Sequence, residues 1–141
     1  MTFKVLLTFL ILFTCHAIPA KDYLVVSNKN KDIQNIDKEL VKDIYLGSKL
    51  FWKNGSRIQP VHLPIDDKGF DTFLSNVVEM DTNQFLAYWR RKLFSGRAHP
   101  PKQISRVQDI LKFVEENPDS IAVLPKKPKI DDSSLIIIEL D

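Results

Sequence analysis

The side chains that could do chemistry in this chain are few and lie far apart in the sequence. His62 and His99 each lack a carboxylate or a second histidine at the spacing of a metal site. Asp66-Asp67 could act as an acid–base pair, but carboxylates are also common at the start of a helix. A nucleophilic triad has no support, because no base accompanies the candidate serines, which are Ser48, Ser56, Ser75 and Ser95. We therefore predict no enzyme activity, no metal and no cofactor.

Basic and aromatic residues offer a different chemistry, the binding of an anion. Arg90, Arg91 and Lys92, followed by Arg97, form a basic cluster at the end of a predicted helix. Cations at that position complement the helix dipole, and they could also form a rim that faces an anion. Trp52 and Trp89 could wall a ligand site, although large aromatic side chains mainly supply buried surface. The core is therefore the favoured place for both tryptophans.

The stretch Ile44–Pro64 contains the elements that would position such a site. Asp37 can cap a helix that runs through Gly47, where a left-handed conformation can close it. A compact loop with Trp52 follows, and Asn54-Gly55 can form a tight turn with positive φ. A large aromatic between two such turns is either a plug beneath a loop or the wall of a site.

Short apolar runs predict the strands of a sheet. Four runs have the length and the side-chain types of strands, namely Tyr23–Ser27, Arg57–His62, Ile121–Leu124 and Leu135–Leu140. Pro60 favours an edge or a strand end for the second of these, because proline has no N–H to donate.

Apolar residues at helical spacing predict three further helices. One has its stripe at Phe70, Phe73, Leu74, Val77 and Val78. The next is capped by Asp81 and places Phe85, Leu86, Trp89 and Leu93 together. The last begins with a capping box of Ser105 and Gln108, and its apolar face is Val107, Ile110, Leu111 and Val114. This order of strands and helices predicts one three-layer α/β domain, with a mixed sheet and helices on both faces.

The first twenty residues have the pattern of a secretion signal. Lys4 is their only charge, and Val5–Phe13 is an apolar run about half as long as the ~20 residues of a spanning helix. Cys15-His16-Ala17 provides small residues for cleavage. We expect a signal peptide over residues 1–17 and a domain over 18–141, in a periplasmic or secreted protein. Cleavage three residues later and lipidation of Cys15 are the alternatives.

Charge and cysteine content narrow the function classes. The chain has 20 basic and 18 acidic side chains, and the balance becomes nearly neutral once Lys4 is removed. That balance gives no reason to propose nucleic-acid binding. Cys15 is the only cysteine, so a mature chain would be stabilised by packing and not by disulfides. No second apolar run is long enough for an integral membrane protein.

A set of residues and short segments follow one another along the chain in a recognisable order. They are Asp43-Ile44-Tyr45-Leu46-Gly47, Trp52, Asn54-Gly55, Ile58-Gln59-Pro60-Val61, Phe73, Tyr88-Trp89, Phe94-Ser95-Gly96, Pro100-Pro101, Val114 and Asn117-Pro118. In this order they resemble the small, single-domain relatives of phosphate-type periplasmic solute-binding proteins. The resemblance covers roughly Tyr23 to Leu124, and it implies a reduced type II periplasmic-binding fold. Full-length members of the wider group hold phosphate between two lobes, with N–H groups at helix N-termini and Ser, Thr and Arg side chains.

The resemblance implies a site for phosphate or another small anion, where the loop after Gly47 approaches the turn at Lys68-Gly69. Its candidate residues are Ser48, Lys49, Trp52, Lys68, Gly69 and Arg97. Asp66 and Asp67 would oppose an anion there, which favours weak and salt-sensitive binding.

Two function classes follow from this interpretation. The first is an exported binding module that delivers a small anion to a membrane transporter or sensor, such as an ABC transporter. The second is a ligand-free interaction protein that keeps the same fold. It predicts an exposed apolar or aromatic patch and no convergent cleft.

Overall fold

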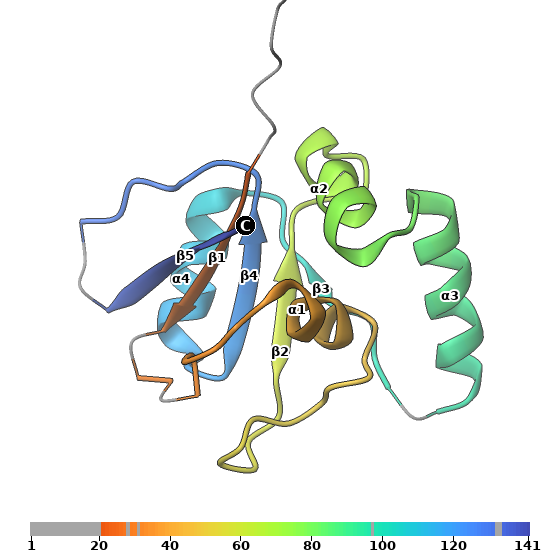
Figure 1. Cartoon of the computed structure of the whole chain (residues 1–141), viewed down its shortest axis with the longest axis horizontal. Coiled ribbons are helices and arrows are strands. Elements are labelled where there is room, and N and C mark those ends of the chain that lie inside the picture. The colour runs from red at the N-terminus through yellow and green to blue at the C-terminus, as the bar shows by residue number, and fades with distance from the viewer. Residues whose placement is uncertain (1–20, 28, 31, 97, 132–133) are drawn as a thin grey trace, which may run out of the picture.

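The computed structural model describes residues 21–27, 29–30, 32–96, 98–131 and 134–141. Their five strands are β1 (Asp22–Ser27), β2 (Gln59–His62), β3 (Lys102–Gln103), β4 (Ser120–Leu124) and β5 (Leu135–Leu140). They form one sheet in the order β3-β2-β4-β1-β5. β2 runs parallel to β3 and β4, whereas β1 runs antiparallel to β4 and β5. The sheet is therefore mixed, and all four strands that the sequence predicts belong to it (Figure 1).

Helices cover both faces of this sheet. They are α1 (Lys38–Tyr45), α2 (Lys68–Phe73), α3 (Thr82–Phe94) and α4 (Val107–Glu116), and a π-helical turn, η1 (Leu74–Val78), continues α2. Side chains alternate along β1, so Leu24 and Val26 pack with α1, α2, η1 and α3 on one face. Val25 packs on the other face with Ile110 and Val114 of α4. The expected single three-layer α/β domain is confirmed.

Local signals set most helix starts. The Asp37 carboxylate accepts a hydrogen bond from the Leu40 N–H and caps α1, and Asp81 forms a capping box with Gln84 at α3. The capping box expected at Ser105 and Gln108 is wrong. α4 begins at Val107, and its N-cap residue is Arg106, whose guanidinium pairs with Asp109 on the surface instead of capping the backbone.

Pro60 does not place β2 at an edge, because β2 lies between β3 and β4. The pairing with β3 starts one residue later, at Val61 opposite Lys102. Pro60 pairs only with Ile121 of β4. An interior strand tolerates this proline because the missing N–H falls where β3 has not yet begun.

α3 packs through a narrower stripe than its sequence suggests. Phe85 and Trp89 are buried, but Leu86 and Leu93 are 42 % and 47 % exposed. All four lie together on one side of the helix, as the sequence predicts, but only two of them are buried in the core. The helix lies at the side of the molecule where the sheet ends with β3, so only one side of it meets the core (Figure 1).

Three expectations fall outside the described residues: the signal peptide over residues 1–17, the alternative lipidation at Cys15, and the site residue Arg97. Within the described part of the chain, no helix has both the length and the apolar character needed to cross a membrane.

Candidate functional site

The turn after α1 forms one wall of the candidate site, and α3 holds it in place. Gly47 has φ +65°, and a Cβ at this residue would lie 2.7 Å from Cη2 of Trp89. Lys92 Nζ donates hydrogen bonds to the carbonyls of Leu46 and Gly47, at 2.7 and 3.1 Å. This lysine of the predicted basic cluster therefore complements the carboxyl end of α1, not that of its own helix.

The loop that follows is anchored by its tryptophan. Trp52 is 4 % exposed, and its Nε1 donates to the carbonyl of Asp119 at 2.9 Å. Ser56 Oγ donates to the carboxylate of the same aspartate at 2.7 Å. The loop is thus attached to the turn before β4, and Trp52 belongs to the core as the sequence favours.

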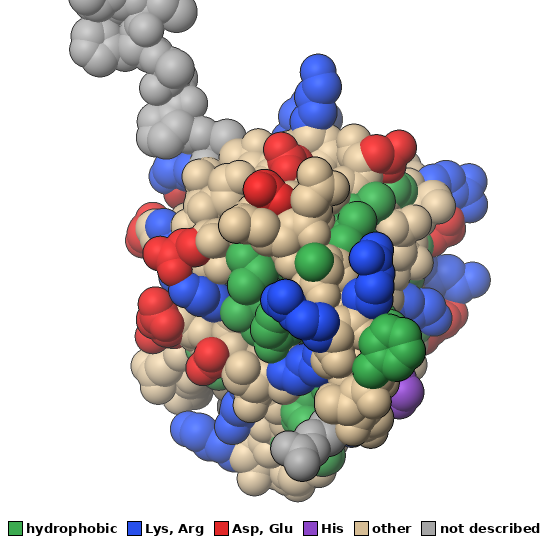
Figure 2. Space-filling view, turned by 90° about the vertical axis from the view of Figure 1, so that its right-hand side faces the viewer, with side chains coloured by type: hydrophobic (Ala, Val, Ile, Leu, Met, Phe, Trp, Pro, Cys, Tyr) green, Lys and Arg blue, Asp and Glu red, His purple; other side chains and the backbone are tan. Residues whose placement is uncertain are grey.

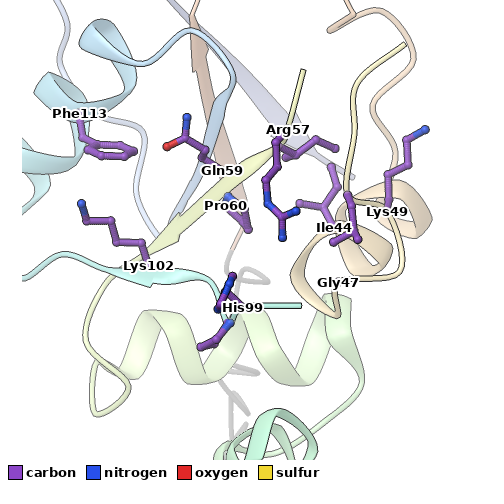
Figure 3. A pocket seen from close by; sticks show the side chains of 12 residues that line it. Ile44, Gly47, Lys49, Arg57, Gln59, Pro60, His99, Lys102 and Phe113 are labelled. Atoms are coloured by element: carbon purple, nitrogen blue, oxygen red, sulfur yellow. The ribbon is translucent and has the colours of Figure 1, made fainter. Parts of the chain in front are cut away.

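A cavity of about 180 Å³ opens beside this loop, at the amino ends of β2 and β3. Its lining comes from the α1 turn, the start of β2, the segment before β3, and α4 (Figure 3). The lining residues are Ile44, Gly47, Lys49, Leu50, Arg57, Ile58, Gln59, Pro60, His99, Pro100, Lys102 and Phe113. Of these described residues, three are cations and none is a carboxylate, so the part of the cavity that the structure describes is electropositive.

The cations approach the cavity from different sides. In Figure 3 the Arg57 guanidinium lies over the middle of the cavity, and the Lys49 ammonium points away from it. Lys102 Nζ lies 4.5 Å from the centre of the Phe113 ring, which is a cation–π contact. None of these three cations forms an ion pair with a described residue. The charges of Arg57 and Lys102 are therefore available to an anion bound in the cavity.

The turn at Lys68-Gly69 lies elsewhere. A Cβ at Gly69 would lie 2.2 Å from Pro125, which follows the carboxyl end of β4, whereas the cavity lies at the amino end of the parallel strand β2. The Asp67 carboxylate already accepts the N–H groups of Gly69 and Phe70. The α2 N-terminus thus has its first donors occupied, and neither Lys68 nor Gly69 lines the cavity.

Only some of the candidate residues that the sequence predicts therefore lie at this cavity. Lys49 lines the cavity, while Ser48 is exposed beside it and donates its backbone N–H to the Asp43 carbonyl. Sequence reasoning missed Arg57, Gln59 and Lys102 as site residues. The only signal was their position in the chain, since Arg57 and Gln59 lie in the predicted strand after the Asn54-Gly55 turn and Lys102 follows Pro100-Pro101. That position does not show that the two segments meet.

His62 has the structural role that its sequence context favours. Its ring stacks on Phe70 with 4.1 Å between centroids, and Nδ1 contacts the Leu63 carbonyl. Burial lowers the pKa of His62 below its ordinary value. Among the described residues, no three His, Cys, Asp or Glu side chains group as metal ligands would.

Comparison with known proteins identifies the fold. No protein-family model and no curated protein matches the chain. The solved structures that are similar to it include PstS from Borrelia burgdorferi, with a TM-score of 0.53 and 14 % identity over 74 % of this chain. They also include an ABC-type phosphate transport receptor from Vibrio cholerae, with a TM-score of 0.50 and 15 % identity over 84 % of this chain. This chain spans 40 % and 45 % of those proteins. At such identities the likeness establishes a distant solute-binding-protein-like fold.

Proposed function

We propose that this protein is an exported binding module for a small inorganic anion, with phosphate as the first anion to test. The observation that carries the proposal is the cavity lined by Lys49, Arg57 and Lys102, with no carboxylate among its described lining residues. The structural neighbour from Vibrio cholerae is named as a phosphate transport receptor, which makes phosphate a reasonable choice. A membrane transporter or sensor would receive the anion.

The side chains suit a tetrahedral oxyanion. The guanidinium of Arg57 can donate two parallel hydrogen bonds to oxygens of one phosphate, and Lys102 can add a compact positive charge. Gln59 lies between them in the lining and offers a neutral amide donor. A water molecule occupies about 30 Å³ of liquid, so a cavity of about 180 Å³ has room for an oxyanion and part of its hydration shell.

The binding should be moderate in strength and sensitive to salt. Arg57, Gln59 and Lys102 are exposed, so ions in solution screen their charges. The chain also spans less than half of each structural neighbour, so it provides fewer contacts than a protein of twice the length could.

Calorimetric titration with phosphate and with sulfate tests the proposal. Arg57→Ala and Lys102→Ala should each weaken binding about tenfold or more, because a hydrogen bond to a charged group contributes about 1.5–3 kcal/mol. Lys112→Ala is the matched control, since it removes an exposed lysine on the outside of α4 that pairs with Glu116.

Two results would overturn this assignment. No heat of binding in the parent protein or its variants would remove the binding-module function and leave the ligand-free interaction protein. A loss of binding in Lys68→Ala, with Lys102→Ala unaffected, would move the site to the α2 turn. There Asp67→Asn should strengthen binding, because it removes a negative charge.

A further inference from the structure

The outward side of α3 is unusually apolar for a helix at the surface. Leu86 and Leu93 are about half exposed, and Phe94 is 89 % exposed. Leu86 and Leu93 lie seven positions apart on one stripe, and Phe94 lies on the neighbouring stripe. A solvent-facing helix side normally carries polar residues, so three large exposed apolar side chains on one helix indicate an interaction site.

A groove of about 380 Å³ runs between this side of α3 and the segment that leads into β3. Leu86 and Leu93 line it from α3, and Pro100 and Pro101 line it from the opposite side. Its inner surface includes Trp89, which is held in place because its Nε1 donates to the Tyr45 carbonyl at 3.2 Å. The groove is therefore a preformed apolar depression with rigid aromatic walls.

The charged side chains that α3 carries beside the groove are all basic. α3 contains no acidic residue, and neither Arg90 nor Arg91 forms an ion pair with any part of the chain that the structure describes. Arg90 lines the groove itself. Figure 2, in which α3 faces the viewer, shows hydrophobic and basic side chains intermingled across the middle of this face, with acidic ones mainly toward its edges. Lys92 differs from the two arginines because it turns inward to the carbonyls of Leu46 and Gly47.

We propose that this groove docks an acidic, amphipathic segment of a partner protein. Large apolar side chains of the segment insert between α3 and Pro100-Pro101, against Trp89, and its carboxylates pair with Arg90 and Arg91. The concave shape favours insertion of side chains over contact with a flat lipid surface. A second copy that presented the same face would bring arginines against arginines, which opposes a symmetric dimer. The proposal is independent of anion binding.

Selection from a displayed library of random twelve-residue peptides tests the proposal while the partner is still unidentified. Peptides selected on the intact protein should be enriched in Asp or Glu together with Leu, Phe or Trp. Fluorescence polarisation with the selected peptides should show at least a tenfold loss of affinity for Leu93→Ser and for the double variant Arg90→Glu/Arg91→Glu. All three positions are exposed, and thermal melting confirms that the variants fold.

Two matched variants leave α3 untouched. Phe51→Ser removes a phenylalanine that is 48 % exposed on the loop after α1, and Lys127→Glu reverses an exposed charge after β4. Both should bind the selected peptides as the parent does, and Arg90→Glu/Arg91→Glu should still bind phosphate as the parent does.

Several outcomes would overturn the proposal. One is a library that yields no binders, or only binders that are indifferent to Leu93→Ser and to the double charge reversal. Binding of the protein to vesicles of anionic phospholipid that depends on Phe94 and Arg90, without peptide binding, would assign the face to a membrane surface. A dimer in sedimentation that Leu93→Ser dissociates would assign it to a second copy.

Discussion

Asp22 is a carboxylate that the fold buries at the start of β1. It is 6 % exposed, and loss of hydration raises its pKa to about 6, although Lys38 acts in the opposite direction. An aspartate in an unfolded chain has a pKa of about 3.9. Between these two values the folded protein holds the proton more often than the unfolded chain, so this group stabilises the fold less as pH rises from about 4 to about 6.

Replacing Asp22 by asparagine, its neutral isostere, should therefore change the free energy of unfolding by an amount that depends on pH. At pH 8 Asp22→Asn should raise the free energy of unfolding by up to about 2–3 kcal/mol, because each pKa unit is worth about 1.4 kcal/mol. At pH 4 the two proteins should be nearly equal. Urea denaturation at both pH values measures the difference, with the exposed Asp131→Asn as control. An equal effect at both pH values would show that the Asp22 charge does not matter to the fold.

At the scale of elements, side chains of α3 hold the carboxyl end of α1 through hydrogen bonds. Besides Lys92, Tyr88 donates its hydroxyl to the Leu46 carbonyl at 2.6 Å, and Trp89 donates to the Tyr45 carbonyl. The last carbonyls of a helix have no partner within the helix, so side chains from another element satisfy them. This contact places the Gly47 turn, and with it one wall of the basic cavity.

Two glycines with similar backbone conformations allow this contact to be tested. Gly47 and Gly96 have φ of +65° and +69°, but a Cβ would have neighbours within 4 Å only at Gly47, where Trp89 is the nearest. Gly47→Ala and Gly96→Ala should share a cost of about 1–2 kcal/mol for the left-handed conformation. Gly47→Ala should cost about 1–3 kcal/mol more, from crowding against Trp89. Chemical denaturation compares the two variants, and equal losses would mean that α3 shifts freely.

At the scale of the whole molecule, the described domain begins close to the expected cleavage site. We expect the mature chain to begin at Ile18, shortly before β1 starts at Asp22, so that cleavage removes none of the sheet. N-terminal sequencing and intact mass of secreted material should show this start. Cytosolic protein that retains Met1 would contradict export. A diacylated Cys15 would place the same domain on a membrane surface.

The sequence alone was enough to predict what depends on neighbouring residues. The β-branched run at Tyr23–Ser27, the aspartate caps at Asp37 and Asp81, and the turn at Gly47 are local signals, and each element they predict is present. The alternation of short strands with amphipathic helices likewise predicted a three-layer α/β domain. Local hydrogen bonds and side-chain periodicity are set within a few residues, so they can be read from the chain.

Only the tertiary structure decided what depends on distant residues. Arg57 and Lys102 line one cavity because β2 pairs with β3, and Lys68 is excluded from it because α2 follows the opposite end of β2. The same holds for α3, where the exposure of Leu93 follows from how much of the helix reaches the core. An amphipathic stripe shows which residues of a helix can be buried. The element against which the helix packs determines which of those residues are actually buried. Strand pairing and helix packing bring together residues that are far apart in the chain. The spacing of these residues in the sequence does not show that they will be in contact.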